Sequence, residues 1–131
     1  MNVHALEPAS LDLRLQARPE FAGAARRNLR AWLEGLGASD EDVFEIVIAA
    51  SEAVANAVEH PRAPTRDAVE VEASLVTECV TVRVRDYGSW QHERLRPGGQ
   101  GFLLMRTLMD SVEVDCQPTG SVITLCRQLS P

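Results

Sequence analysis

Two consecutive segments of the chain alternate apolar and polar residues with a period of two. The apolar positions are Val69, Val71, Ala73, Leu75, Val80, Val82 and Val84. The residues between them are polar or charged, and a turn is expected near Thr77 and Glu78. Successive side chains of a strand point to opposite faces of a sheet, so the pattern predicts an antiparallel hairpin with one apolar face. That face must be covered by another layer, which the rest of the chain has to supply.

Two segments with helical spacing precede the hairpin. The first, over residues 19–37, opens on a proline and closes on a glycine, which are the residues suited to those ends of a helix. The second is expected to begin at Ser39, a good N-cap, and to end near His60, because Pro61 disfavours helical geometry in the residue before it. Acidic residues at 40–42 suit the positive end of the helix dipole.

The remaining segments complete a small mixed domain. Residues 11–15 alternate and predict a half-buried strand, residues 101–109 predict a short helix, and residues 112–126 predict a second hairpin. The order is strand, two helices, two strands, helix, two strands. We therefore expect a single α+β domain over residues 1–131, a two-layer sandwich in which helices cover one face of a mixed, mainly antiparallel sheet.

Composition narrows the classes of function. The 13 basic and 19 acidic side chains give a formal net charge of −6, so we expect no direct binding to nucleic acid, which needs clustered basic residues. The three cysteines form no CxxC pair, which argues against a zinc site or a disulfide framework. The N-terminal segment lacks the features of a signal peptide, and no apolar run is long enough to span a bilayer. We expect a cytoplasmic protein without membrane contact.

Glu52 and Asn56 are four residues apart on the longer predicted helix, and His60 follows one turn later. Asparagine is a poor residue for a helix interior because its side chain competes for backbone hydrogen bonds. The presence of Asn56 inside the predicted helix therefore needs an explanation. On spacing alone, the simplest interpretation is the solvated edge of an amphipathic helix.

Two further signals follow along the chain. Asp86 and Gly88 stand at the end of a valine-rich strand, where a carboxylate can face a cleft and a glycine lets a flat ligand approach the backbone. Residues 98–101, Gly-Gly-Gln-Gly, lead into a helix, whose free N–H groups suit phosphate. Each signal alone is compatible with an ordinary turn or connector. All three in this order are far more specific than any one of them.

The chain resembles the ATPase superfamily shared by gyrase, histidine kinases and mismatch-repair ATPases. Residues 51–60 resemble its N box, 84–88 its G1 box, 99–105 its G2 box and 120–125 its closing strand. The best match within it is the compact branch of anti-sigma-factor serine/threonine kinases, which share Glu-Ala-x-x-Asn-Ala followed by His, and a Met-Asp before a Val-x-Val strand, here in residues 108–114. The resemblance covers about residues 11–129 and implies a Bergerat-type ATP-binding fold.

ATP and Mg²⁺ are the cofactors that the resemblance implies. Asp86 would accept a hydrogen bond from the adenine amino group, Gly88 would allow close approach of the ring, and Thr124 would assist at the adenine. Asn56 would supply a carbonyl oxygen to Mg²⁺, a hard cation that prefers oxygen ligands.

The phosphate end of the implied site includes two glycines, a glutamate and two arginines. Gly99 and Gly101 would present N–H groups to the phosphates. Glu52 would act as general base toward a serine or threonine hydroxyl of a partner protein. Arg94 and Arg96, in the loop that resembles a lid, would neutralise the γ-phosphate during transfer.

The resemblance implies a protein kinase that holds a sigma factor and phosphorylates an antagonist of the anti-sigma factor, in a partner-switching system. It also implies a homodimer, and we hypothesise that the strand over residues 11–15 forms the contact. Two alternatives remain open. One is a non-catalytic, nucleotide-gated binding module, which would need Asn56 and Asp86 but no base, so the presence of Glu52 argues against it. The other, weaker alternative is a histidine-kinase fragment, because the chain has no room for dimerisation helices.

The chain departs from the family pattern after the Asp-x-Gly motif. Ser89 and Trp90 stand where many relatives carry a second glycine, and the loop that resembles a lid is short.

Overall fold

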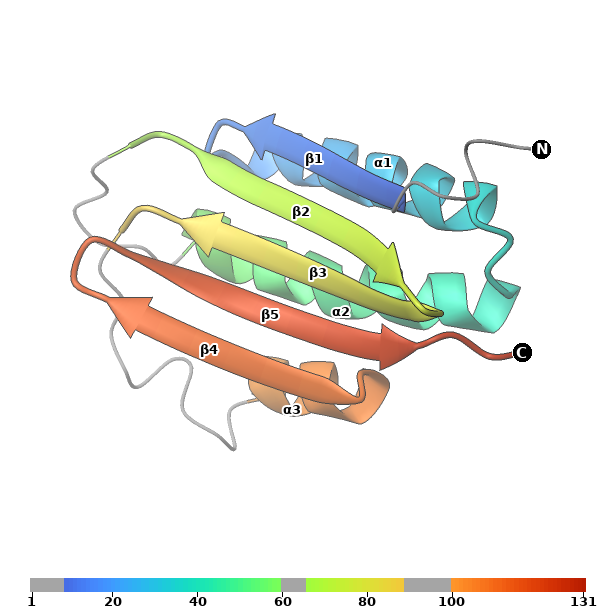
Figure 1. Ribbon diagram of the computed structural model, residues 1–131. Helices are drawn as coiled ribbons and strands as arrows, with labels where there is room; N and C mark the ends of the chain where they lie inside the picture. Colours follow the sequence, from blue (N-terminus) through green and yellow to red (C-terminus); the bar gives the residue numbers. More distant parts are fainter. Residues whose placement is uncertain (1–8, 60–65, 89–99) are drawn as a thin grey trace.

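The computed structural model describes residues 9–59, 66–88 and 100–131 (Figure 1). In chain order, its elements are β1 (Ala9–Leu15), the short 3₁₀ helix η2 (Pro19–Phe21), α1 (Ala22–Gly35), α2 (Asp40–Glu59), β2 (Val69–Val76), β3 (Cys79–Asp86), α3 (Gln100–Leu108), β4 (Ser111–Gln117) and β5 (Gly120–Gln128). The predicted order of strands and helices is confirmed.

The five strands form one sheet in the order β1-β2-β3-β5-β4. Every pairing between described strands is antiparallel, with Val71 opposite Val84 and Val82 opposite Leu125. The expected antiparallel character is therefore confirmed, but among the described strands the sheet is not mixed. β3 and β4 do run in the same direction, but β5 lies between them and pairs with both in the antiparallel sense.

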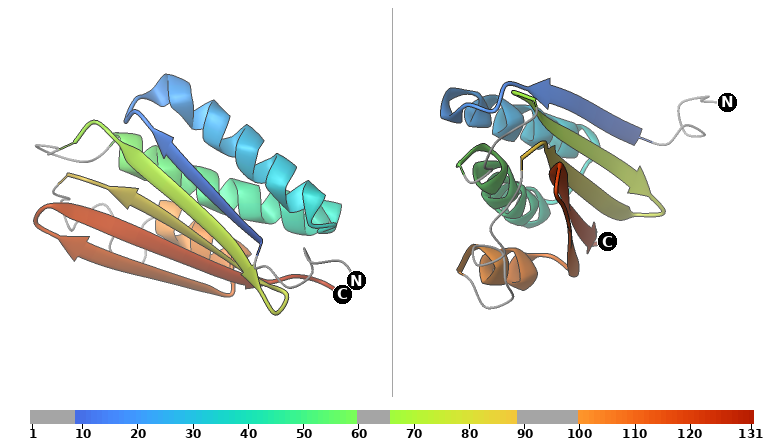
Figure 2. Two further views of the ribbon diagram at one scale, coloured as in Figure 1. Left: turned by 45° about the horizontal axis from the view of Figure 1, so that its top comes forward. Right: turned by 90° about the vertical axis from the view of Figure 1, so that its left-hand side faces the viewer.

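The helices cover one face of the sheet, as Figure 2 shows, and the α+β two-layer arrangement is confirmed. On β2 and β3 the residues that face the helices are buried, except the half-buried Leu75, and those that alternate with them are exposed or half-buried. Burial of this apolar face against α1, α2 and α3 supplies most of the driving force for folding. In the described ranges, no helix is long and apolar enough to cross a bilayer.

A buried polar network joins α2, α3 and β5. Asp42, fully buried in the first turn of α2, accepts hydrogen bonds from Arg127 Nη2 (2.7 Å) and from the backbone N–H of Ser130 (2.8 Å). The Arg127 Nη1 group bonds Glu45 and donates to the carbonyl oxygen of Leu108 (2.9 Å), the last residue of α3. One arginine of β5 therefore fixes the beginning of α2 and the end of α3.

The network perturbs the pKa values of its charged groups. Burial raises the pKa of Asp42, but hydrogen bonds from Ser130 and Ser39 and the charge of Arg127 outweigh burial, so the pKa lies below its ordinary value. Burial lowers the pKa of Arg127, but its hydrogen bond to Glu45 and the charges of Glu45 and Asp42 raise it above its ordinary value. Both groups are therefore charged at neutral pH.

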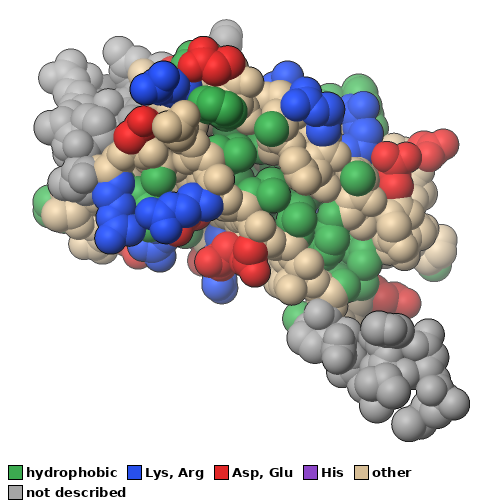
Figure 3. All heavy atoms as spheres, turned by 90° about the horizontal axis from the view of Figure 1, so that it is seen from above, with side chains coloured by type: hydrophobic (Ala, Val, Ile, Leu, Met, Phe, Trp, Pro, Cys, Tyr) green, Lys and Arg blue, Asp and Glu red, His purple; other side chains and the backbone are tan. Residues whose placement is uncertain are grey.

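β1 forms one edge of the sheet. Figure 3, which looks onto the molecule from the top of Figure 1, shows a strip of hydrophobic side chains between charged ones. On β1, the residues Leu11, Leu13 and Leu15 pack against the core and are only partly buried. A homodimer through β1 stays a prediction.

Candidate functional site

Asp86 ends β3 on the face that the helices cover. Its side chain is 2% exposed, and one carboxylate oxygen, Oδ1, accepts a hydrogen bond of 3.0 Å from the backbone N–H of Gly88. Alternation along β3 places it on the same face as the buried Val84. The Asp-x-Gly motif is therefore a tight turn that holds a carboxylate inside the protein. Burial of a carboxylate costs free energy unless polar groups surround it. Buried carboxylates of this kind are common in binding sites.

Ser121 lies directly opposite Asp86 in the register of β3 and β5. It is 2% exposed, and its hydroxyl oxygen is buried with no hydrogen-bond partner among the residues that the structure describes. The neighbouring Gly120 lets the two strands approach closely, because a Cβ there would lie 2.5 Å from the carbonyl oxygen of Asp86. A buried hydroxyl without a partner is unfavourable, so an unpaired donor beside Asp86 points to a ligand.

Thr124 does not lie on the same face of the sheet as Asp86, and this arrangement contradicts the predicted contact of both residues with the adenine. It pairs with Arg83 and Glu113, and these three residues line a groove on the sheet face that no helix covers. Paired residues project from the same face, and Arg83 is exposed whereas Asp86 is buried. Asp86 and Thr124 are therefore on opposite sides of the sheet. The residue of β5 that accompanies Asp86 is Ser121.

The sequence contains a signal for Ser121. It precedes Ile123 and Leu125 at two-residue spacing, so it occupies the buried side of the strand, and it follows a glycine. A polar residue at a predicted core position next to a glycine is a better candidate for a ligand contact than one on the alternate face.

Asn56 and Glu52 lie on α2, as their spacing predicted. The Asn56 side chain is 9% exposed, and that of Glu52 is half-buried. Asn56 is therefore not on a solvated edge of the helix. The Glu52 carboxylate lies against Gly101, the second residue of α3, so the segments that resemble the N box and the G2 box meet at these two residues. Gly99, Arg94 and Arg96 lie outside the described residues.

Tyr87 follows Asp86 and anchors the end of β3. Its hydroxyl donates to Glu70 Oε1 of β2, and the guanidinium carbon of Arg66 lies 5.2 Å from the centroid of its ring. The hydrogen bond to Glu70 raises the pKa of Tyr87, and burial and the charge of Glu70 act in the same direction. This neutral phenol ties β3 to β2 beside the Asp-x-Gly turn.

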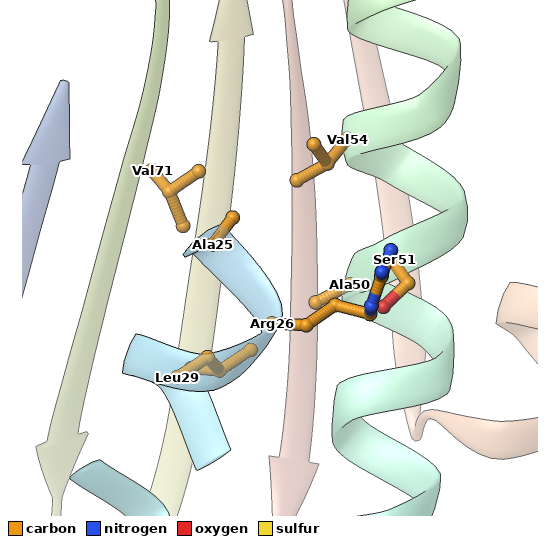
Figure 4. Close-up of a pocket in the computed structure, with 7 residues that line it drawn as sticks. All are labelled: Ala25, Arg26, Leu29, Ala50, Ser51, Val54 and Val71. Atoms are coloured by element: carbon orange, nitrogen blue, oxygen red, sulfur yellow. The ribbon is translucent and has the colours of Figure 1, made fainter. Parts of the chain in front are cut away.

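A separate small pocket lies between α1, α2 and β2, and Figure 4 shows the residues that line it. They are Ala25, Arg26, Leu29, Ala50, Ser51, Val54 and Val71. The Ser51 hydroxyl donates to the carbonyl oxygen of Val47 (2.6 Å), within the helix. No predicted site residue lines this pocket, so it is a packing gap beneath α1 rather than part of the candidate site.

Comparisons with known proteins agree with the geometry. A family model described as a histidine kinase-like ATPase domain matches residues 15–127. The serine-protein kinase RsbW of Bacillus licheniformis is 29% identical over 138 residues, covering 92% of this chain and 86% of the relative. The serine-protein kinase RsbW of Listeria innocua is 30% identical over 131 residues, covering 86% and 83%.

Solved structures share the fold of this chain. The crystal structure of the RsbU and RsbW domains of Rv1364c from Mycobacterium tuberculosis matches with a TM-score of 0.78 and 30% identity, covering 93% of this chain and 33% of that one. A chain of the SiaB–SiaC complex from Pseudomonas aeruginosa matches with a TM-score of 0.68 at 10% identity, covering 88% of each chain, which shows a likeness of fold alone.

Proposed function

Because the chain belongs to the family of histidine kinase-like ATPase domains, we propose that it is an ATP-dependent protein serine/threonine kinase that acts as an anti-sigma factor. It phosphorylates an antagonist protein and holds a sigma factor when that antagonist is not available. Relatives named serine-protein kinase RsbW, similar over 86–92% of this chain, support the proposal. The cytoplasm is the compartment in which such a protein would meet both partners.

Asp86 and Ser121 form the adenine end of the proposed site. The buried carboxylate of Asp86 accepts a hydrogen bond from the exocyclic amino group of adenine, which selects adenine over guanine. The Ser121 hydroxyl gains the hydrogen-bond partner that it lacks among the described residues, directly or through a water molecule. Gly88 has no side chain that would keep the flat ring from approaching the backbone. The buried, unpaired hydroxyl beside Asp86 is the single observation that carries this assignment.

Glu52, Asn56 and Gly101 form the phosphate end. ATP supplies the phosphoryl group that is transferred, and Mg²⁺ neutralises its charge. Asn56 offers an amide oxygen, the type of ligand that Mg²⁺ takes. Gly101 offers a backbone N–H in the first turn of α3, where the helix dipole favours phosphate. Glu52 takes the proton from the serine or threonine hydroxyl whose oxygen becomes phosphorylated. The roles proposed for Gly99, Arg94 and Arg96 complete the phosphate site.

Calorimetric titration with ATP, with and without Mg²⁺, tests the nucleotide site. We expect the wild type to bind, Asp86→Asn to abolish binding because the amide presents a donor to the adenine amino group, and Asn56→Ala to remove the dependence on Mg²⁺. Absence of binding by the wild type at millimolar ATP would contradict the proposal and leave a nucleotide-independent interaction protein.

Transfer of labelled γ-phosphate to purified candidate antagonist proteins tests the kinase. Loss of the general base is expected to slow transfer by about 10²–10⁴-fold in Glu52→Ala, with ATP affinity retained. If Glu52→Ala and the wild type label the antagonist equally, Glu52 is not the base. ATP binding without any transfer would favour the nucleotide-gated binding module instead.

A further inference from the structure

Gly101 occupies a position where a glycine is not required by the backbone. It is the second residue of α3, and the described glycine with a positive φ is Gly37, at 79°. Gly101 is thus in a conformation that any residue adopts. Glycine is also among the poorest helix formers, so local structure would favour alanine. The reason for a glycine at this point must lie outside α3 itself.

The Glu52 side chain supplies that reason. A Cβ built at Gly101 would overlap Glu52 Oε1, and would lie 3.2 Å from Cδ and 3.3 Å from Cγ of the same side chain. The three nearest atoms therefore all belong to the residue proposed as the general base. The space that a Cβ would fill is the space that the carboxylate occupies.

α3 cannot easily move to relieve such an overlap. Phe102, Met105 and Met109 are buried in the core, with exposures of 6%, 0% and 5%. The end of the helix is held by the hydrogen bond from Arg127 to the carbonyl oxygen of Leu108. The overlapping atoms of Glu52, in contrast, are the far end of a flexible side chain. A substitution at Gly101 would therefore displace the carboxylate and not the helix.

We propose that Gly101 is a positioning residue for the general base. Because Gly101 has no side chain, the Glu52 carboxylate can occupy the space beside the beginning of α3, the end of the helix that is proposed to bind the phosphates. This inference rests on the proposed function, in which Glu52 is the base. An alanine at 101 keeps the backbone N–H that is offered to phosphate, so binding and phosphate transfer should respond differently to it.

Thermal unfolding of the protein without nucleotide tests the steric part. The variants are Gly101→Ala, Glu52→Ala, the double variant, and Gly35→Ala as a matched control, since Gly35 is also helical and a Cβ there meets nothing within 4 Å. We expect Gly35→Ala to raise the midpoint by roughly 2 °C. Gly101→Ala should raise it similarly when Glu52 is also replaced by alanine, but raise it less, or lower it, when Glu52 is present. Equal effects of Gly101→Ala in the two backgrounds would overturn the proposal.

Calorimetry with MgATP and phosphate transfer to the antagonist test the functional part. Gly101→Ala should keep the MgATP affinity within about threefold, because the N–H is retained, while transfer falls by at least about tenfold. It should add no further loss to Glu52→Ala. Glu52→Asp, which shortens the side chain by one methylene, should reduce the loss of transfer that Gly101→Ala causes.

The outcomes separate the two proposals. If Gly101→Ala weakens MgATP binding equally with and without Glu52, the glycine serves phosphate approach and the positioning role is wrong. If the wild type binds no MgATP, the proposed function fails, and the unfolding measurements alone decide whether Gly101 makes room for Glu52.

Discussion

Asp86 and Ser121 show how a strand register creates a site that neither residue makes alone. Each is 2% exposed, and they lie opposite each other on the helix-covered face of β3 and β5. Thr124, only three residues from Ser121, projects from the other face. Neighbouring residues of a strand project to opposite faces of the sheet. A residue of β5 can therefore contact the same ligand as Asp86 only if it projects to the helix-covered face, however close it is in sequence.

Ser121→Ala and Thr124→Ala form a matched pair that tests this assignment. Ser121→Ala removes a buried hydroxyl without a partner, so the free energy of unfolding of the nucleotide-free protein should rise by about 1 kcal/mol. The same change removes one hydrogen bond to the bound nucleotide, so the Kd for ATP should rise by roughly tenfold. Thr124→Ala should leave the Kd unchanged. Calorimetry and denaturant unfolding measure both quantities, and the reverse result for the Kd would show that the adenine contact is on the open face.

At the scale of elements, the fold depends on how α3 is fixed between α2 and β5. Phe102 and Met105 of α3 are buried, as is Met109 directly after the helix. Arg127 of β5 donates to the last carbonyl group of α3 and also bonds Asp42 and Glu45 of α2. α3 is short, and isolated helices of this length are not stable in water. Its position, and hence the contact between Gly101 and Glu52, comes from these tertiary contacts.

Arg127→Ala is expected to lower the free energy of unfolding by about 3–5 kcal/mol, because it leaves the fully buried Asp42 carboxylate without its charged partner. Arg18→Ala is the matched control. Arg18 and Asp67 are 3.9 Å apart with side chains more than half exposed, so removal of Arg18 should cost less than about 1 kcal/mol. Urea unfolding of both variants checks the comparison. Equal costs would mean that the buried network contributes no more than a surface ion pair.

At the scale of the whole molecule, the same network sets a response to acid. Asp42 has a pKa below its ordinary value of 3.8 in the folded protein. The folded state therefore binds fewer protons at this site than the unfolded state, and stability from Asp42 is fully present above the unfolded pKa. It is lost as the pH falls through the folded pKa.

Denaturant unfolding at a series of pH values from 6 down to about 2 tests this response. The wild type should lose stability below pH 3.8, the ordinary pKa of Asp42. Asp42→Asn should be less stable at neutral pH and should have a flatter profile in the acid range. The control is Asp40→Asn, since Asp40 is exposed two residues earlier in the same helical turn and its loss should leave the profile nearly unchanged. If Asp42→Asn keeps the full acid dependence, other carboxylates are responsible for it.

Much of the molecule could be predicted from local patterns. Two-residue alternation placed β2 and β3, and the spacing of apolar residues, with Ser39 as N-cap, placed α1 and α2. Asn56 in an apolar helix, Asp86 at a strand end and the glycine loop marked the candidate site before any geometry was known. These features are local because a helix or a strand presents its side chains with a fixed period, whatever the element packs against.

Only the tertiary structure decided which residues of distant segments lie next to each other. The order β1-β2-β3-β5-β4 inserts β5 between β3 and β4, which run in the same direction, so both pairings of β5 are antiparallel. The same register brings Ser121, and not Thr124, to Asp86, and the packing of α3 on α2 brings Gly101 to Glu52. A strand period says that a residue faces one side or the other, but pairing and packing between distant segments determine its neighbours. That is why the motifs were readable from the sequence, whereas the contacts between them were not.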